Sequence, residues 1–116
     1  MEARDVVQAM IDAYNAHDLD RCLSFYASDV VMKRADGTIA TDGAEAVRAR
    51  YAKSMSDHPN LHYDITNRIA LGPYVIDEER VTGYSPGGPE AMRAVLIYRF
   101  DGALIHEILI LARFEF

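Results

Sequence analysis

A chain of 116 residues has room for one domain, and its formal net charge of −6 disfavours binding to nucleic acid or to an anionic membrane. The basic residues are scattered, with no run longer than Lys33-Arg34. The single cysteine, Cys22, excludes an intrachain disulfide, and no stretch approaches the roughly 20 apolar residues of a membrane span. Because the N-terminus also lacks a signal-peptide pattern, we expect a cytoplasmic protein.

The first half of the chain predicts three amphipathic helices. Their apolar residues recur at helical spacing: Val7, Met10, Ile11 and Tyr14; then Leu19, Cys22, Leu23 and Tyr26; then Val47, Tyr51 and Met55. The first helix should span residues 4–16. Asp18 is suited to cap the second helix, which should end at Ser28-Asp29. Asp42 and Glu45 form an aspartate version of the capping box and should open the third helix.

The second half predicts an antiparallel meander. Four strand-like runs span residues 61–71, 74–84, 92–100 and 104–114. Short turns rich in Gly, Pro or Asp-Gly separate them, and short turns force antiparallel neighbours. Residues 30–32 should pair with residues 38–40 across Asp36-Gly37, which makes a fifth strand available. We therefore expect a single α+β domain over residues 1–116, with three N-terminal helices packed on a curved antiparallel sheet.

The last two strands carry apolar residues on both faces, over residues 94–98 and 108–111. A sheet that is covered on one face should instead alternate apolar and polar residues. The helices can cover one face, and a second copy of the chain is the economical cover for the other, so we expect a homodimer through the sheet. The alternative is that the C-terminal tail, residues 113–116, folds over that face.

Three short motifs support this layout: Asn15-Ala16-His17-Asp18-Leu19-Asp20, Phe25-Tyr26-Ala27-Ser28-Asp29, and the start of the third helix from Gly43 to Tyr51. They resemble the "N-A-x-D-x-D", "F-A-x-D" and "G-x-x-A-I-R-x-x-Y" motifs of the nuclear transport factor 2-like superfamily, which includes SnoaL-like and ketosteroid isomerase-like proteins. The resemblance covers nearly the whole chain and implies a cone-shaped, cystatin-like roll around an apolar pocket. It does not imply one reaction, because the fold hosts isomerases, dehydratases, epoxide hydrolases, cyclases and binding proteins.

The resemblance also argues against ketosteroid isomerisation. In that enzyme group a tyrosine, a carboxylate base and a protonated aspartic acid carry the reaction. The matching positions here are Met10, Arg34 and Leu96, so all three groups are absent. Only a supporting tyrosine of the third helix is matched, as Tyr51.

An acid pair on the second meander strand is the strongest candidate for chemistry. Asp77 and Glu79 are two residues apart, so they share one face of the strand. The resemblance implies that this face lines the pocket, although Tyr74, Ile76 and Tyr84 compete for the inner position. Burial and mutual repulsion would then keep one acid protonated beside an ionised partner, which provides a general acid and a general base. The resemblance to epoxide hydrolases of the fold suggests Arg34 as the cation between them.

We expect the catalytic residues to be Asp77, Glu79 and Arg34. We expect the ligand-binding residues to be Tyr14, Tyr51, Tyr98, Met10, Leu96 and Leu109. The ligand should be a small hydrophobic molecule, and the chemistry should be that of an isomerase, dehydratase or hydrolase with no cofactor and no metal. Three alternatives stay open: an acid pair on a solvated face, a structural salt bridge with Arg34, and a non-enzymatic dimeric binding or assembly module.

Overall fold

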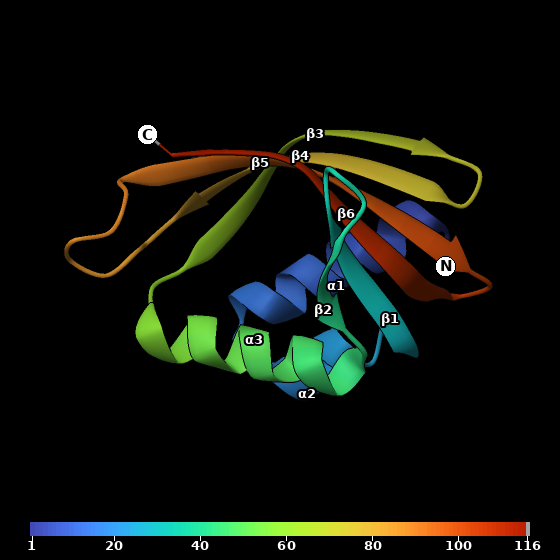
Figure 1. Cartoon of the computed structure of the whole chain (residues 1–116), viewed down its shortest axis with the longest axis horizontal. Coiled ribbons are helices and arrows are strands. Elements are labelled where there is room, and N and C mark those ends of the chain that lie inside the picture. The colour runs from blue at the N-terminus through green and yellow to red at the C-terminus, as the bar shows by residue number, and fades with distance from the viewer. Residues whose placement is uncertain (116) are drawn as a thin grey trace.

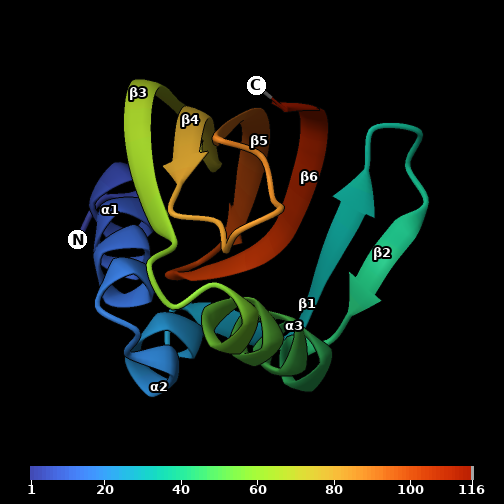
Figure 2. The same ribbon diagram turned by 90° about the vertical axis from the view of Figure 1, so that its left-hand side faces the viewer.

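The computed structural model describes residues 1–115, and of Glu115 only the backbone. Its elements are α1 (Ala3–Asn15), α2 (Leu19–Leu23), β1 (Tyr26–Arg34), β2 (Ile39–Asp42), α3 (Ala44–Asp57), β3 (His62–Leu71), β4 (Tyr74–Thr82), β5 (Ala91–Asp101) and β6 (Leu104–Glu115). Figures 1 and 2 show a curved sheet that arches over the three helices. The fold is therefore α+β, with one face of the sheet covered by helices and the other turned outward.

The sheet has six strands in the order β2-β1-β6-β5-β4-β3. The predicted meander is confirmed, because β3, β4, β5 and β6 pair in sequence as antiparallel neighbours. The predicted hairpin of β1 and β2 is also confirmed. Strand β1 joins the meander by pairing in parallel with β6. Irregular pairing between β5 and β6, after Val95 and again after Arg99, marks the bulges that help the sheet to bend.

The second helix is much shorter than the sequence pattern predicts, and the expected end at Ser28-Asp29 is wrong. Helix α2 ends at Leu23, and Tyr26 already lies in β1 opposite Ile105 of β6. The backbone N–H of Ile105 donates to the carbonyl of Phe25 at 2.9 Å. Sheet pairing with Ile105, which lies 79 residues further along the chain, therefore overrides the local helical pattern.

The start of α3 also differs from the expected capping box. Asp42 is the last residue of β2, and Gly43 is the N-cap with no side-chain cap hydrogen bond. Gly43 has a φ of 89°, a backbone conformation that glycine adopts readily. Its N–H donates to the carbonyl of Val30 at 2.8 Å, so the turn from β2 into α3 is stabilised by backbone contact with β1.

The core lies between the helices and the concave face of the sheet. The fully buried residues include Val7, Val30, Val47, Val75 and Ile108, which come from α1, β1, α3, β4 and β6. The outer face keeps large apolar side chains exposed: Ile69, Leu71, Tyr74, Leu111 and Phe114. The C-terminal tail continues β6 through Glu115, and Phe116 lies outside the described residues.

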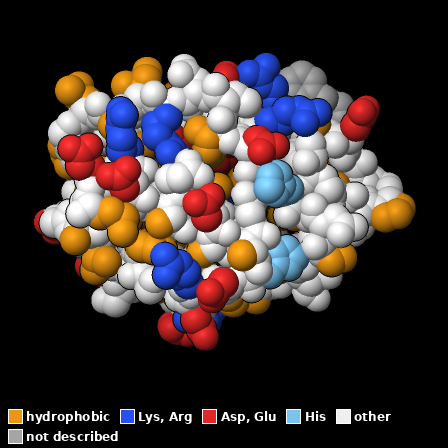
Figure 3. Space-filling view, turned by 180° about the vertical axis from the view of Figure 1, so that it is seen from behind, with side chains coloured by type: hydrophobic (Ala, Val, Ile, Leu, Met, Phe, Trp, Pro, Cys, Tyr) orange, Lys and Arg blue, Asp and Glu red, His pale blue; other side chains and the backbone are white. Residues whose placement is uncertain are grey.

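The surface carries both signs of charge. On the face shown in Figure 3, acidic and basic side chains are interspersed with apolar ones. Within the described part of the chain, no helix is both long enough and apolar enough to cross a membrane.

Candidate functional site

A cavity of about 150 Å³ lies between α1, α3 and the inner face of the sheet. Its wall is mostly apolar and contains the side chains of Met10, Ile11, Met32, Val81, Met92, Ala94, Leu96 and Ile110. Its polar lining consists of four tyrosines, Tyr14, Tyr51, Tyr63 and Tyr98, together with Ser54, Glu79, Arg50 and Arg113. An apolar chamber with a few convergent polar groups is typical of a small-molecule site.

Glu79 places a carboxyl group in this chamber. The residue is 3% exposed, and its Oε2 atom has no hydrogen-bond partner among the described residues. Burial, and then the negative charge of Asp77, raise the pKa of Glu79 from 4.5 to about 8, against a lowering by Arg113. The carboxyl is therefore mainly protonated at neutral pH, and it is the buried polar group that a ligand would satisfy.

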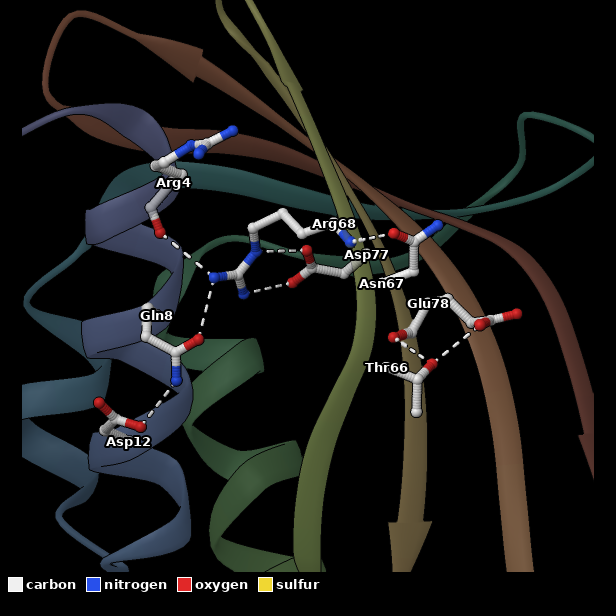
Figure 4. Close-up of polar contacts among 8 residues, drawn as sticks. All are labelled: Arg4, Gln8, Asp12, Thr66, Asn67, Arg68, Asp77 and Glu78. Carbon is white, nitrogen blue, oxygen red and sulfur yellow. Dashed lines mark hydrogen bonds and ion pairs between the residues drawn. The ribbon is translucent and has the colours of Figure 1, made fainter.

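Asp77 shares the inner face with Glu79, as the strand parity predicts, but it does not line the cavity. Its carboxylate is completely buried and accepts two hydrogen bonds from Arg68, from Nε at 2.6 Å and from Nη2 at 2.8 Å. Arg68 also donates to Oε1 of Gln8 on α1 at 2.9 Å, and Gln8 donates to Asp12 (Figure 4). Asp77 thus ties β4 to β3 and, through Arg68, to α1, and the alternative of a solvated face is wrong.

The sequence contained a signal for this pair. The turn at Gly72-Pro73 places Leu71 opposite Tyr74, and counting three residues away from the turn along each strand places Arg68 opposite Asp77. A bulge interrupts the register only beyond this point, between Ile65 and Asn67. Short antiparallel hairpins fix register in this way, so Arg68 could have been found from the turn alone.

Arg34 is not the cation beside Asp77. It ends β1 and is exposed, and its guanidinium donates to Thr38 Oγ1 at 3.3 Å and to the carbonyl of Ile39 at 3.1 Å. Arg34 is on the same face of β1 as Met32, which lines the cavity. It lies two residues further along the strand, however, where the hairpin with β2 begins to turn. The expectation that Arg34 bridges the two acids is therefore wrong, and the cation that pairs with Asp77 is Arg68.

Five of the six expected ligand-binding residues line the cavity: Met10, Tyr14, Tyr51, Leu96 and Tyr98. Leu109 does not. It pairs with Ile97 on the outward parity, while Ile108 and Ile110 point inward. The bulge that follows Arg99 inserts an extra residue in β6 and reverses the parity expected from simple alternation.

The tyrosines form a connected cluster around the chamber. The hydroxyls of Tyr26 and Tyr51 are 2.8 Å apart, and the ring of Tyr14 packs edge-on against Tyr51 and Tyr63 at centroid distances of 5.0 and 4.8 Å. Burial raises the pKa of Tyr51 and of Tyr98, so both hydroxyls stay neutral and available to donate. Tyr63, which the sequence pattern had not indicated, completes the set from β3.

The chamber thus combines a neutral carboxylic acid with neutral hydroxyl donors in an apolar wall. Such an acid can donate a proton to a substrate oxygen, and after ionisation it can accept one from carbon. A sequence profile of the SnoaL-like domain matches residues 7–108 of this chain. The chain belongs to the SnoaL-like domain family. Among curated proteins, no sequence matches it significantly.

Solved structures agree with this SnoaL-like assignment. An uncharacterised cystatin-fold protein from Novosphingobium aromaticivorans is 28% identical, with a TM-score of 0.88 over 97% of this chain and 99% of its own. A SnoaL-like protein of unknown function from Burkholderia thailandensis is 26% identical, with a TM-score of 0.76 over 93% and 92%. A protein from Catenulispora acidiphila with a ketosteroid isomerase-like fold, in complex with trimethylamine, is 22% identical, with a TM-score of 0.76 over 90% and 82%. The last similarity shows the fold alone.

Proposed function

We propose that this SnoaL-like protein binds a small, largely apolar molecule in the cavity and transfers a proton to or from it through Glu79, without a cofactor. The observation that carries the proposal is the buried carboxyl of Glu79, which faces the chamber with one oxygen unpartnered among the described residues. A structural carboxyl at this depth would be expected to have a partner, as Asp77 has in Arg68.

The electrostatics suit general acid–base catalysis. A catalytic group works best when its pKa is close to the operating pH, and Glu79 has a pKa of about 8. The tyrosine hydroxyls supply donors for an oxygen that becomes negative during proton transfer. Isomerases, dehydratases and some hydrolases share this step, so the proposal is a reaction class and not a substrate.

We assign Asp77 a role in setting the protonation of Glu79, in place of the catalytic role expected from the acid pair in the sequence. Its carboxylate is held by Arg68 and does not reach the chamber. Its negative charge nevertheless raises the pKa of Glu79, so it contributes to keeping that acid protonated. Arg34 has no place in the proposed chemistry because it lies outside the cavity.

The cavity also limits the size of the ligand. A buried apolar space of about 150 Å³ holds a molecule of the size of benzene, whereas sites for drug-sized ligands are roughly 300–1,000 Å³. The walls at Met10 and Leu96 carry no acid or hydroxyl at the positions where ketosteroid isomerases act. We therefore propose a substrate smaller than a steroid.

Proton exchange at the α-carbon of a small ketone tests the proposal directly. Cyclohexanone in D2O is followed by ¹H NMR with the wild type, Glu79→Gln and the matched control Glu78→Gln. Glu78 is adjacent in sequence but lies on the outer face, where it pairs with Arg93. It also accepts a hydrogen bond from Thr66 (Figure 4). We expect exchange above background in the wild type and the control, and loss in Glu79→Gln. No exchange above background, or exchange that survives in Glu79→Gln, would count against proton transfer by Glu79.

We further propose that the protein is a homodimer through the outer face of the sheet. Phe114 is 67% exposed there, and Leu111 is 47% exposed. Large apolar side chains gathered on one sheet face are typical of an association surface.

A further inference from the structure

Two arginines line the cavity together with Glu79, and their positive charges indicate which class of ligand the cavity binds. Arg50 comes from α3 and is half-buried, whereas Arg113 comes from β6 and is exposed. Glu79 is only 3% exposed. The two guanidinium groups therefore lie toward the solvent side of the chamber, and the neutral acid lies at its buried end.

Neither arginine has a carboxylate partner among the side chains that the structure describes. Arg50 donates to Thr41 Oγ1 at 3.2 Å, and Nε of Arg113 contacts the sulfur of Met92. Other arginines of the chain do have partners, as in the pairs Arg48–Asp20, Arg68–Asp77, Arg93–Glu78 and Arg99–Glu107. The cavity thus carries two positive charges that the described carboxylates leave uncompensated.

The other polar groups of the cavity wall favour a ligand that carries a hydrogen-bond acceptor. The hydroxyls of Tyr14, Tyr51 and Tyr98 are neutral donors, and the protonated carboxyl of Glu79 is a further donor. A ligand that matches this wall carries a negative charge at one end and an oxygen acceptor or an apolar edge at the other. The chamber volume of about 150 Å³ restricts its body to roughly one ring.

We propose that the cavity takes a small monocarboxylate, with the carboxylate toward Arg50 and Arg113 and the apolar body among the tyrosines below Glu79. This inference rests on the proposed function for the cavity and adds the substrate class. Arginine suits this task because its planar guanidinium forms charge-assisted hydrogen bonds with a carboxylate.

Three probes of similar size separate charge from shape: benzoate, its neutral counterpart benzamide, and the cation benzylammonium. Binding is measured at pH 6.5 by isothermal titration calorimetry and by ¹H–¹⁵N NMR shifts of the cavity residues. We expect benzoate to bind at least roughly tenfold tighter than benzamide, since hydrogen bonds to charged groups contribute that much. Benzylammonium should bind more weakly than either.

Variants of the two arginines test whether these side chains cause the preference for benzoate. Arg50→Gln and Arg113→Gln should each remove much of the advantage of benzoate over benzamide, and the double variant should remove all of it. Arg48→Gln is the matched control, because Arg48 lies on the same helix but pairs with Asp20 outside the cavity. Raising the salt concentration on the wild type gives a measurement that needs no variant, since salt should weaken benzoate and leave benzamide unchanged.

Equal binding of benzoate and benzamide, a preference for benzylammonium, or a benzoate preference that persists in the double variant would overturn the inference. The outcome is separable from the test of proton transfer. Glu79→Gln should lose ketone exchange yet keep its preference for benzoate, whereas the arginine variants should lose the preference first. A failure of the carboxylate preference is therefore distinguishable from a failure of proton transfer by Glu79.

Discussion

The substitution Glu79→Gln isolates the energetic cost of placing an ionisable group in the cavity. Glutamine has the shape of the protonated acid but cannot ionise. In the folded protein the pKa of Glu79 is about 8, against an ordinary 4.5, so the folded state binds the proton more tightly than the unfolded state does. At a pH between these two pKa values, the folded state holds a proton that the unfolded chain has released. The free energy of unfolding must therefore fall as the pH rises.

The magnitude follows from the two values. Each pKa unit is worth about 1.4 kcal/mol, so an ionised Glu79 costs the fold about 4–5 kcal/mol once the pH exceeds its folded pKa of about 8. Below about pH 4.5 the acid is protonated in both states, and the wild type and Glu79→Gln should differ little in pH dependence. Glu79→Gln should gain stability relative to the wild type by roughly 1.4 kcal/mol per pH unit across this window.

Urea unfolding of the wild type, Glu79→Gln and Glu78→Gln at pH 5, 6, 7, 8 and 9 measures this difference, with protein concentration held fixed because association would shift apparent stability. Glu78 is a suitable control because it lies on the outer face and pairs with Arg93. A difference between wild type and Glu79→Gln that stays constant from pH 5 to pH 9 would refute the argument that Glu79 is buried and neutral. Direct ¹³C NMR titration of the Glu79 carboxyl in the folded protein should have its midpoint near pH 8.

Three further predictions concern a buried ion pair, a glycine turn and the outer face of the sheet. Arg68→Met should destabilise the protein by about 3–5 kcal/mol in urea unfolding, because it leaves the buried carboxylate of Asp77 unpaired, and a loss below 1 kcal/mol would contradict that pairing. Gly83→Ala should fail to fold or lose several kcal/mol, since its Cβ would collide with a backbone carbonyl at a φ of +86°, whereas Gly37→Ala, with open space at a φ of +88°, should lose only about 1 kcal/mol in the same assay. Phe114→Asp should convert the expected homodimer to a monomer in sedimentation equilibrium, and a wild type that is already monomeric at micromolar concentration would reject the dimer.

Local patterns in the sequence determined most of the framework. Helical periodicity predicted α1 and α3, and the turns with Gly, Pro and Asp-Gly predicted the meander of β3 to β6. Strand parity placed Asp77 and Glu79 on one face of β4, and the family resemblance assigned that face to the pocket side, where both are buried. These features depend on residues that are close in sequence, so one chain without a structure is enough to indicate them.

Contacts between distant segments decided the rest. The pairing of Tyr26 with Ile105 ended α2 early, and a bulge in β6 turned Leu109 outward. The cavity brings Arg50 and Arg113 together with Glu79 from α3, β6 and β4, and no local spacing relates these three residues.

The two acids of β4 show the division most clearly. Sequence alone determined that they share a face, but it could not assign them different roles. The tertiary structure gave Asp77 a partner in Arg68 and left Oε2 of Glu79 without one among the described residues. The physical reason is that the ionisation of a buried acid depends on its burial and on the charges around it, and distant parts of the chain supply both.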